Sequence, residues 1–136
     1  MYLLDTNTVS ELRKPKPHGG VLAWVSAQEA STLFVSSMTI AEIQRGIEMT
    51  RMQDEAKVVQ LEAWLDEVLV TGQVLALDAG VCRQWARLMH QRSDSLVEDA
   101  FIAATAMVHG LVVVSRNVRD FKTLGLKALN PFTGKA

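Results

Sequence analysis

The 136-residue sequence offers little for disulfide or thiolate chemistry, because Cys82 is its one cysteine. A single thiol excludes an internal disulfide and any metal site built from several cysteines. Cys82 lies in the run VCRQWARLM, whose apolar residues recur at helical spacing. We therefore expect Cys82 to be a buried thiol without a chemical role.

Long hydrophobic runs are also missing. No apolar stretch approaches the ~20 residues that a membrane-spanning helix needs. The amino-terminal MYLLDTNTVSEL has no basic start followed by a long apolar stretch, so we do not expect a signal peptide. Hydrophobic residues make up 49% of the chain and charged residues 21%, which is typical of a globular protein with one core. We expect residues 1–136 to form a single domain in the cytoplasm, with no membrane partner.

The sequence has no strong excess of either charge, since its net charge is −1. The charges are unevenly placed, however. Residues 54–67 contain five acidic residues and one lysine, whereas the segment from Leu111 onward has one acidic and five basic residues: Arg116, Arg119, Lys122, Lys127 and Lys135. A basic end fits a phosphate backbone, but an ordinary solvated face explains the same charges equally well.

Short runs rich in β-forming residues predict the strands of a sheet. The four clearer runs and a weaker fifth one are Tyr2–Leu4, Leu33–Val35, Val74–Leu77, Leu111–Val114 and Lys127–Leu129. Stretches with helical periodicity separate them. This alternation predicts an α/β fold with a central, mainly parallel sheet of four to five strands and helices on both faces.

Four stretches between the predicted strands have a distinct character. Helical spacing of apolar residues over 58–69 predicts the longest helix, and residues 81–89 predict another with one buried face. Phe101–Val108 has no charged residue, which is typical of a helix packed on most of its surface, and we expect Gly110 to end it. The segment KPKPHGG, residues 14–20, predicts a loop between early helices.

Polar residues follow the predicted strands at the edge where ligands of parallel sheets bind. Asp5 follows the first strand, Glu42 lies one helical turn beyond the serines after the second, and Asp99 begins the apolar helix. Asp120 follows the fourth strand, just after Ser115, Arg116 and Asn117. Four converging carboxylates repel one another unless a cation lies among them. Oxygen ligands suit Mg²⁺ or Mn²⁺, and such ions suit phosphodiester hydrolysis.

Each carboxylate alone also has a structural explanation. Asp5 fits the cap of a helix beginning near Thr8, and Thr39-x-x-Glu42 matches a capping box. Asp99 fits a favourable anion at a helix N-terminus, and Asp120 fits a turn before the next apolar residue. Only the convergence of all four carboxylates on one edge of the sheet therefore points to a metal site.

Four motifs resemble one known family over essentially the whole chain. YLLDTNTVSEL, SSMTIAEIQRGI, EDAFIAATA and SRNVRDF, the last followed by LNP, are similar in order and spacing to PIN-domain toxins of the VapC type, especially the FitB-like branch. The resemblance assigns that family's acidic positions to Asp5, Glu42, Asp99 and Asp120, with Asp99 preferred over Glu98. Ser115 departs from the threonine that commonly begins the last motif. The segment HQRSDSLVE lacks the Gly/Pro-rich loop expected before Asp99.

The resemblance implies a toxin of a type II toxin–antitoxin pair that is an endoribonuclease dependent on Mg²⁺, with Mn²⁺ as an alternative. The implied substrate is single-stranded or loop RNA, attacked in line by a metal-activated water to leave 5′-phosphate and 3′-hydroxyl ends. Asp5 and Asp99 are then the direct metal ligands, and Glu42 and Asp120 complete the site. Implied partners are a cognate antitoxin, through which alone DNA is contacted, and a second copy in a homodimer.

Residues around the carboxylates receive supporting roles under the same reading. Ser115 and Asn117 orient ligands or substrate, and Arg116 contacts phosphate or is a surface arginine bound to nothing. An antitoxin arginine is expected to enter the acidic site. Three tryptophans (Trp24, Trp64 and Trp85) either cover a dimer interface or lie in the monomer core.

Two other functions remain open at this point. One is a non-catalytic subunit whose carboxylates bind a basic partner. The other is a haloacid-dehalogenase-like phosphatase, because LLDTNTV is similar to the start of that family. There Asn7 replaces the usual acid/base aspartate, which argues against it.

Overall fold

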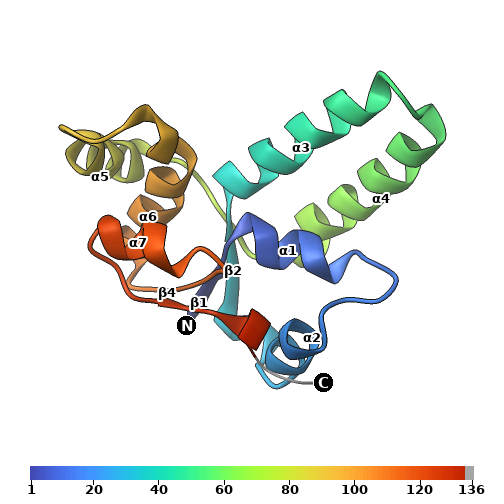
Figure 1. The fold of residues 1–136 in the computed structure, drawn as a ribbon, viewed down its shortest axis with the longest axis horizontal. Coiled ribbons are helices and arrows are strands. Elements are labelled where there is room, and N and C mark those ends of the chain that lie inside the picture. The colour runs from blue at the N-terminus through green and yellow to red at the C-terminus, as the bar shows by residue number, and fades with distance from the viewer. Residues whose placement is uncertain (134–136) are drawn as a thin grey trace.

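The structure, a computed structural model, describes residues 1–133, so Lys135 lies outside the described residues. Its centre is a sheet of five parallel strands in the order β3-β2-β1-β4-β5 (Figure 1). The strands are β1 (Tyr2–Leu4), β2 (Leu33–Ser36), β3 (Val74–Leu75), β4 (Val112–Val114) and β5 (Ala128–Leu129). All five predicted strands are present, and the parallel sheet is confirmed. The third is shorter than predicted, ending at Leu75.

Within residues 1–133, seven α-helices and three short 3-10 helices lie between the strands or follow the last one. The helices are α1 (Thr6–Leu12), α2 (Gly19–Ser26), α3 (Ser37–Arg51), α4 (Glu55–Thr71), α5 (Ala79–Met89), α6 (Val97–His109) and α7 (Val118–Thr123). The 3-10 helices are η1 (Ala30–Thr32), η2 (Asp94–Leu96) and η3 (Pro131–Thr133). With 17 residues α4 is the longest helix, as predicted.

The loop predicted over residues 14–20 is shorter than expected. Gly19 and Gly20 form the first turn of α2, because the imidazole Nδ1 of His18 accepts the amide hydrogen of Gly20 and caps the helix. The predicted end of the loop was wrong for this reason: the sequence shows two flexible glycines but not the histidine cap that orders them.

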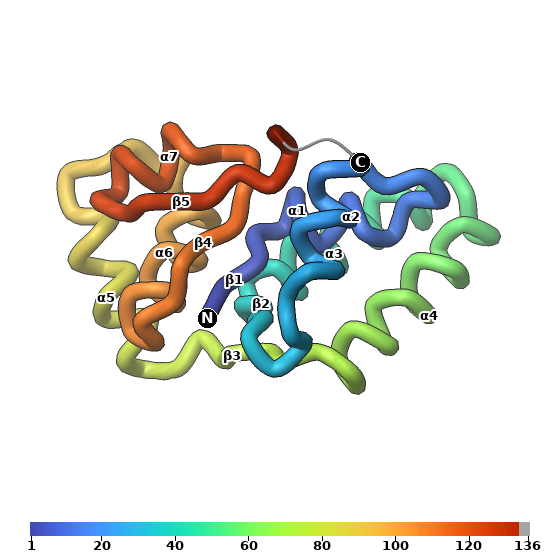
Figure 2. Tube along the Cα trace, turned by 90° about the horizontal axis from the view of Figure 1, so that it is seen from below, coloured from blue at the N-terminus to red at the C-terminus, as the bar shows by residue number. Residues whose placement is uncertain are grey.

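Helices cover both faces of the sheet, as predicted, because side chains alternate between the faces along each strand. Leu3 and Val113 pack with α5, α6 and α7, whereas Leu4 and Val114 pack with α1, α3 and α4. Figure 2 shows the central strands between these two groups of helices. The two cores therefore fix the ends of β1 and β4, from which the candidate site is built.

The apolar helix predicted over Phe101–Val108 is the centre of α6. Ile102, Ala103 and Ala104 are fully buried, and small alanines allow α6 to pack closely on α5. Gly110 ends the helix in the left-handed conformation with φ of +66°, which glycine adopts without strain. The first turn of α6 is thereby held rigidly at the sheet edge.

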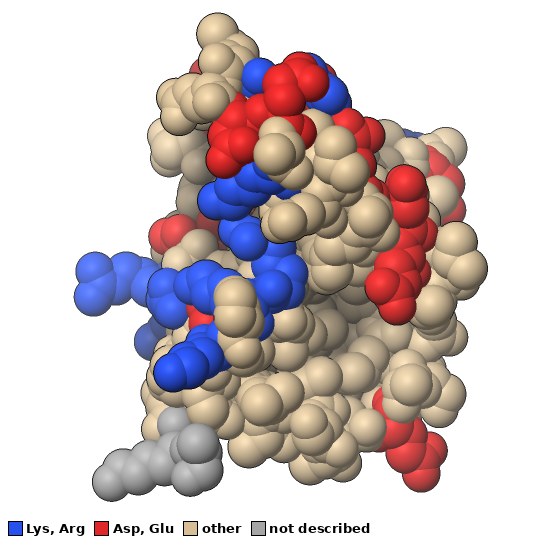
Figure 3. Space-filling model, turned by 90° about the vertical axis from the view of Figure 1, so that its right-hand side faces the viewer, with Lys and Arg blue, Asp and Glu red and all other residues tan. Residues whose placement is uncertain are grey.

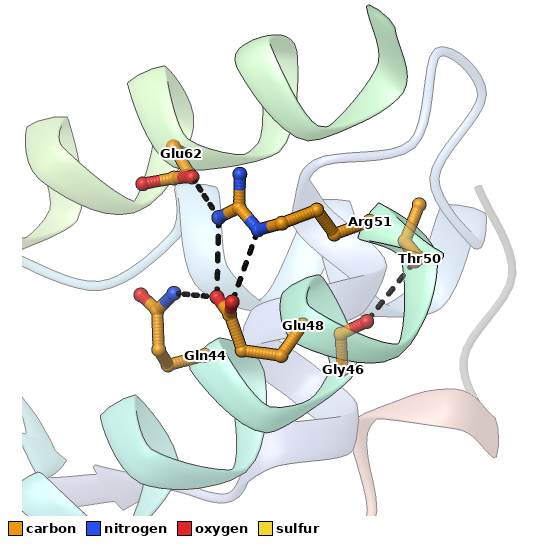
Figure 4. A network of polar contacts seen from close by, with 6 residues as sticks. All are labelled: Gln44, Gly46, Glu48, Thr50, Arg51 and Glu62. Atoms are coloured by element: carbon orange, nitrogen blue, oxygen red, sulfur yellow. Dashed lines mark hydrogen bonds and ion pairs between the residues drawn. The ribbon is translucent and has the colours of Figure 1, made fainter. Parts of the chain in front are cut away.

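Helices α3 and α4 form a hairpin that projects from the sheet (Figure 1). Inside it, Ile47 packs with Val58 in the core on this face of the sheet. On its surface Arg51 joins the two helices, since its Nε donates to Glu48 at 3.0 Å and its Nη2 donates to Glu62 on α4 (Figure 4). The hairpin is thus held together by core packing and by Arg51, and it lies beside the edge where β1 and β2 end.

The prediction that Cys82 is buried was wrong, because its side chain is exposed. Val81 and Leu88 form the buried stripe of α5, and the next residue after Val81 lies about 100° further round the helix. The Cys82 Sγ lies 3.6 Å from the carbonyl oxygen of Leu77. Among the described residues, no helix is both long and apolar enough to cross a membrane.

The three tryptophans are all partly buried. Trp24 and Trp64 pack against the core beside α3 and α4, and Trp85 stacks on Phe101 with the ring centroids 4.4 Å apart. Each tryptophan thus already contributes to the core of one chain. The homodimer stays a prediction.

Candidate functional site

The structure brings the four predicted carboxylates together at the carboxyl ends of the strands. Asp5 directly follows β1, Glu42 lies in the second turn of α3, and Asp99 and Asp120 lie in the first turns of α6 and α7. One pocket is lined by Asp5, Thr6, Asn7, Glu42, Asp99 and Asn117. Asp120 does not line that pocket, but it lies close enough to Asp99 for its negative charge to raise the pKa of that carboxyl.

Asp5 is the most deeply buried of the four, with 3% of its surface exposed. The Ser115 hydroxyl donates to its Oδ2 at 2.6 Å, and the Thr6 amide donates to its Oδ1 at 2.8 Å. Burial raises the pKa of Asp5, and the hydrogen bonds from Ser115 and Thr6 oppose that rise. Asp5 caps α1, as the alternative reading suggested, but the same contacts also fix both of its oxygens toward the pocket side of the sheet edge.

Asp99 has the most perturbed ionisation in the site. Burial, followed by the negative charges of Asp5, Asp120 and Glu42, raises its pKa to about 7. No lysine or arginine lines the pocket, and none of the four carboxylates forms an ion pair within residues 1–133. The cluster is therefore electrostatically unfavourable as it stands, and a cation bound there would relieve the repulsion.

The capping box predicted for Thr39 and Glu42 was wrong. Ser36 is the N-cap of α3, and its hydroxyl accepts the amide hydrogen of Met38. Helix α3 therefore starts one turn earlier than a capping box at Thr39 requires. This frees Glu42, whose Oε1 accepts a hydrogen bond of 2.8 Å from the Thr6 hydroxyl. Burial raises the pKa of Glu42, and the Thr6 bond opposes that rise.

Sequence reasoning missed Thr6 and Asn7 as members of the site. Thr6 connects Glu42 to Thr39, whose hydroxyl lies 2.9 Å away. Asn7 donates to Asp5 and to Ser115, both at 3.2 Å, and its Oδ1 accepts the Arg116 amide. The sequence does contain a signal for both residues. Thr6 and Asn7 are polar and directly follow Asp5, so they lie at the same edge of the sheet as Asp5.

Ser115, Asn117 and Arg116 lie where the motif after β4 places them. The buried Ser115 hydroxyl bonds Asp5 and accepts the Asn117 amide at 2.8 Å. Arg116 is exposed, yet its guanidinium lies 4.0 Å from the centre of the Phe132 ring, a cation–π contact. Arg116 is therefore held against Phe132 and is not an arginine without contacts.

Both the topology and the sequence match one known family. A family model described as PIN domain matches residues 2–126. This chain belongs to the PIN domain family. A PIN domain assignment rules out the haloacid-dehalogenase-like alternative, and with it the reading of Asn7 as a replaced catalytic acid.

Individual relatives agree over nearly the full length of this PIN domain. The chain is 39% identical to the VapC ribonuclease Y4jK of Sinorhizobium fredii, with 97% of this chain and 98% of the relative covered. It is 29% identical to the toxin FitB of Neisseria gonorrhoeae, covering 97% and 99%. The solved structure of FitAcB from Neisseria gonorrhoeae superposes with a TM-score of 0.84 at 28% identity, over 97% and 99% of the two chains.

Proposed function

We propose that this protein is the toxin of a type II toxin–antitoxin pair and acts as a metal-dependent endoribonuclease. The observation that carries the proposal is the cluster of four carboxylates at the edge of the parallel sheet, with no lysine or arginine among the described residues that line its pocket. The relatives named ribonuclease and toxin match this PIN domain along nearly its whole length, which supports the same activity here.

The chemistry of the donor set fits Mg²⁺, with Mn²⁺ as an alternative. As the side chains stand, no group of three or more acidic, histidine or cysteine residues within 1–133 is arranged to hold an ion. Mg²⁺ commonly takes one or two carboxylates and keeps several waters. We assign Asp5 and Asp99 as direct ligands, with Glu42 and Asp120 completing the site. A bound divalent cation supplies the polarisation that makes water a nucleophile and stabilises charge on the phosphate.

The surrounding side chains orient these ligands. Ser115 donates a hydrogen bond to Asp5 and the Thr6 hydroxyl donates one to Glu42, and these bonds restrict the orientation of the two carboxylates. We assign to Asn117, on the pocket wall, the role of orienting an RNA phosphate for in-line attack, and to Arg116, whose guanidinium packs on Phe132, a phosphate contact. Hydrolysis then leaves 5′-phosphate and 3′-hydroxyl ends.

The partner that fits this site is an antitoxin with an arginine in its inhibitory segment. A guanidinium can donate to two carboxylate oxygens at once, so a cluster lacking its own basic residue is a favourable place for it. DNA contact then belongs to the antitoxin, and the toxin reaches DNA only through it.

RNA cleavage by the purified, antitoxin-free protein tests the proposal. Total RNA should be cut with Mg²⁺ or Mn²⁺, left intact with EDTA, and left intact by Asp5→Asn. Glu98→Gln is the matched control: it removes a neighbouring carboxylate that faces Arg45 at 3.8 Å, and it should retain cleavage. Intact RNA under all metal conditions, together with tight antitoxin binding, would establish the non-catalytic alternative.

A further inference from the structure

A groove lies next to the carboxylate cluster, between α1 and the α3–α4 hairpin. Its inner part shares Thr6 and Glu42 with the pocket of the cluster. Its outer part shares Arg13, Leu61 and Trp64 with the inner part, so the three hollows lie next to one another. The outer part has a volume of about 350 Å³ and is completed by Pro15, Lys57 and Gln60. We call the inner and outer parts together the lateral groove.

The outer end of the lateral groove is basic. Arg13 ends α1, Lys57 lies in the first turn of α4, and both are exposed. Neither has a carboxylate within 4.0 Å in the part of the chain that the structure describes, whereas Lys14 is bound to Glu11. Figure 3 shows this side of the molecule, where lysine and arginine side chains gather in one band.

The acidic residues of segment 54–67 do not line the lateral groove. The face of α4 toward the groove presents Lys57, Gln60, Leu61 and Trp64. Glu62 is bound by Arg51 at the surface of the hairpin (Figure 4). Among the described residues that line the lateral groove, Glu42 is the one carboxylate, and it lies at the end next to the cluster.

Trp64 gives the groove an aromatic wall. Its side chain is partly buried against the core, and it lines both the inner and the outer part. Proteins that bind single-stranded nucleic acid combine such a stacking surface with cations along the backbone. A nucleobase is smaller than the ligands that occupy pockets of 300 Å³ and above, so the outer part can hold one.

From this arrangement we propose that the lateral groove binds the single-stranded RNA on one side of the bond that is cut. Arg13 and Lys57 contact backbone phosphates, and a base stacks on Trp64. The proposal rests on the proposed ribonuclease activity. An endonuclease must hold a chain that continues past its reacting phosphate, and this groove lies next to the proposed reacting centre, with Thr6 and Glu42 in the walls of both. Unpaired cations placed away from the carboxylates match the charge of that continuing chain.

Equilibrium binding without metal tests this inference separately from catalysis. The probe is a fluorescein-labelled single-stranded RNA of mixed sequence, about a dozen nucleotides long, titrated in EDTA at several salt concentrations and followed by anisotropy. Each phosphate contact on a single strand contributes about 0.7 to the slope of log K against log salt. The double variant Arg13→Ala/Lys57→Ala should reduce that slope by about 1.4 and weaken binding about tenfold at low salt.

Two further variants separate stacking from charge. Trp64→Phe keeps an aromatic face and should bind nearly as the wild type, whereas Trp64→Leu should lose at least about fivefold in affinity. Thermal melting of both variants checks that the core beside Trp64 stays folded. Arg83→Ala/Arg87→Ala on α5 changes the net charge equally, away from the groove, and should leave the slope unchanged.

Three results would overturn the inference. One is an unchanged salt slope for Arg13→Ala/Lys57→Ala, and another is an equal loss in Arg83→Ala/Arg87→Ala, which would reflect net charge alone. The third is wild-type RNA binding by the groove variant together with weakened inhibition by the antitoxin, which would make the groove a protein-binding surface. Because the binding assay needs no cleavage, a protein that fails to cut RNA would refute the proposed function but would leave the RNA-binding role of the lateral groove to be judged by these binding results.

Discussion

Replacing Asp99 by asparagine should make the metal-free protein more stable while abolishing its activity. The reason is the crowding of negative charge, since burial and the charges of Asp5, Asp120 and Glu42 hold the pKa of Asp99 near 7. Asparagine resembles the protonated carboxyl in shape and carries no charge. It also caps helices well, so a purely structural role at the start of α6 would be retained.

The magnitude follows from proton linkage. A pKa of about 7 in the folded protein against 3.8 in the unfolded chain corresponds to about 4 kcal/mol, at ~1.4 kcal/mol per tenfold change in proton affinity. Solvent screening reduces this figure because Asp99 is only partly buried, and we expect about 1–2 kcal/mol. A raised pKa stabilises the fold below the unfolded value of 3.8, and this contribution is lost as the pH rises through about 7.

Urea unfolding in EDTA at pH 4 and pH 8 measures this effect. Wild type and Asp99→Asn should have nearly the same free energy of unfolding at pH 4, whereas the variant should be about 1–2 kcal/mol more stable at pH 8. Adding Mg²⁺ at pH 8 should stabilise the wild type and leave the variant unchanged. Glu98→Gln, one residue away, should show no such gain. If Asp99→Asn is equal or less stable at pH 8, the electrostatic reasoning is wrong.

Four further predictions follow from the same structure. Ser115→Ala should lower the initial rate of cleavage about 10- to 100-fold, whereas Ser115→Thr should retain most of it, because only the alanine variant loses the hydroxyl that donates to Asp5. Equal initial rates for the two variants would exclude this positioning role. Cys82 should react with one equivalent of a thiol reagent in the native protein, since it is exposed; reaction only after denaturation would contradict the structure. Replacing the antitoxin arginine by alanine should weaken inhibition at least tenfold, or ~1.4 kcal/mol, and equal inhibition in a titration would refute the contact. Light scattering across a dilution series should give a dimer mass, and a monomer at high micromolar concentration would refute the dimer.

Much of the fold was predictable because its signals are local. The five strands are short apolar runs, and α6 is a stretch without charges, so composition alone distinguishes them from the amphipathic helices. Two predictions about the fold were wrong, the end of the loop at residue 20 and the burial of Cys82, because each depends on a single cap or a single helix position. His18 orders two glycines into α2, and the one-residue offset from Val81 turns Cys82 outward.

The convergence of the carboxylates was predictable, since parallel strands end at one edge and Asp5, Asp99 and Asp120 follow or face those ends, whereas their role as a site stays a prediction. Their fine arrangement was not. The Thr6 hydroxyl bonds Glu42 across 36 positions of sequence, and no local pattern shows such a contact. Likewise α3 starts at Ser37 because Ser36 is its N-cap, and the sequence alone does not show that Ser36 rather than Thr39 takes this position.

The fate of the attacking oxygen is the most direct test of metal-assisted hydrolysis by this protein. Cleavage of a short single-stranded RNA in water enriched with oxygen-18, in the presence of Mg²⁺, is followed by mass spectrometry of both products. If the carboxylate cluster supports metal-assisted attack by water, the label should appear on a 5′-phosphate and the other product should end in a 3′-hydroxyl. Unlabelled products with a 2′,3′-cyclic phosphate and a 5′-hydroxyl would show that the RNA's own 2′-hydroxyl attacks, and would contradict the proposed chemistry.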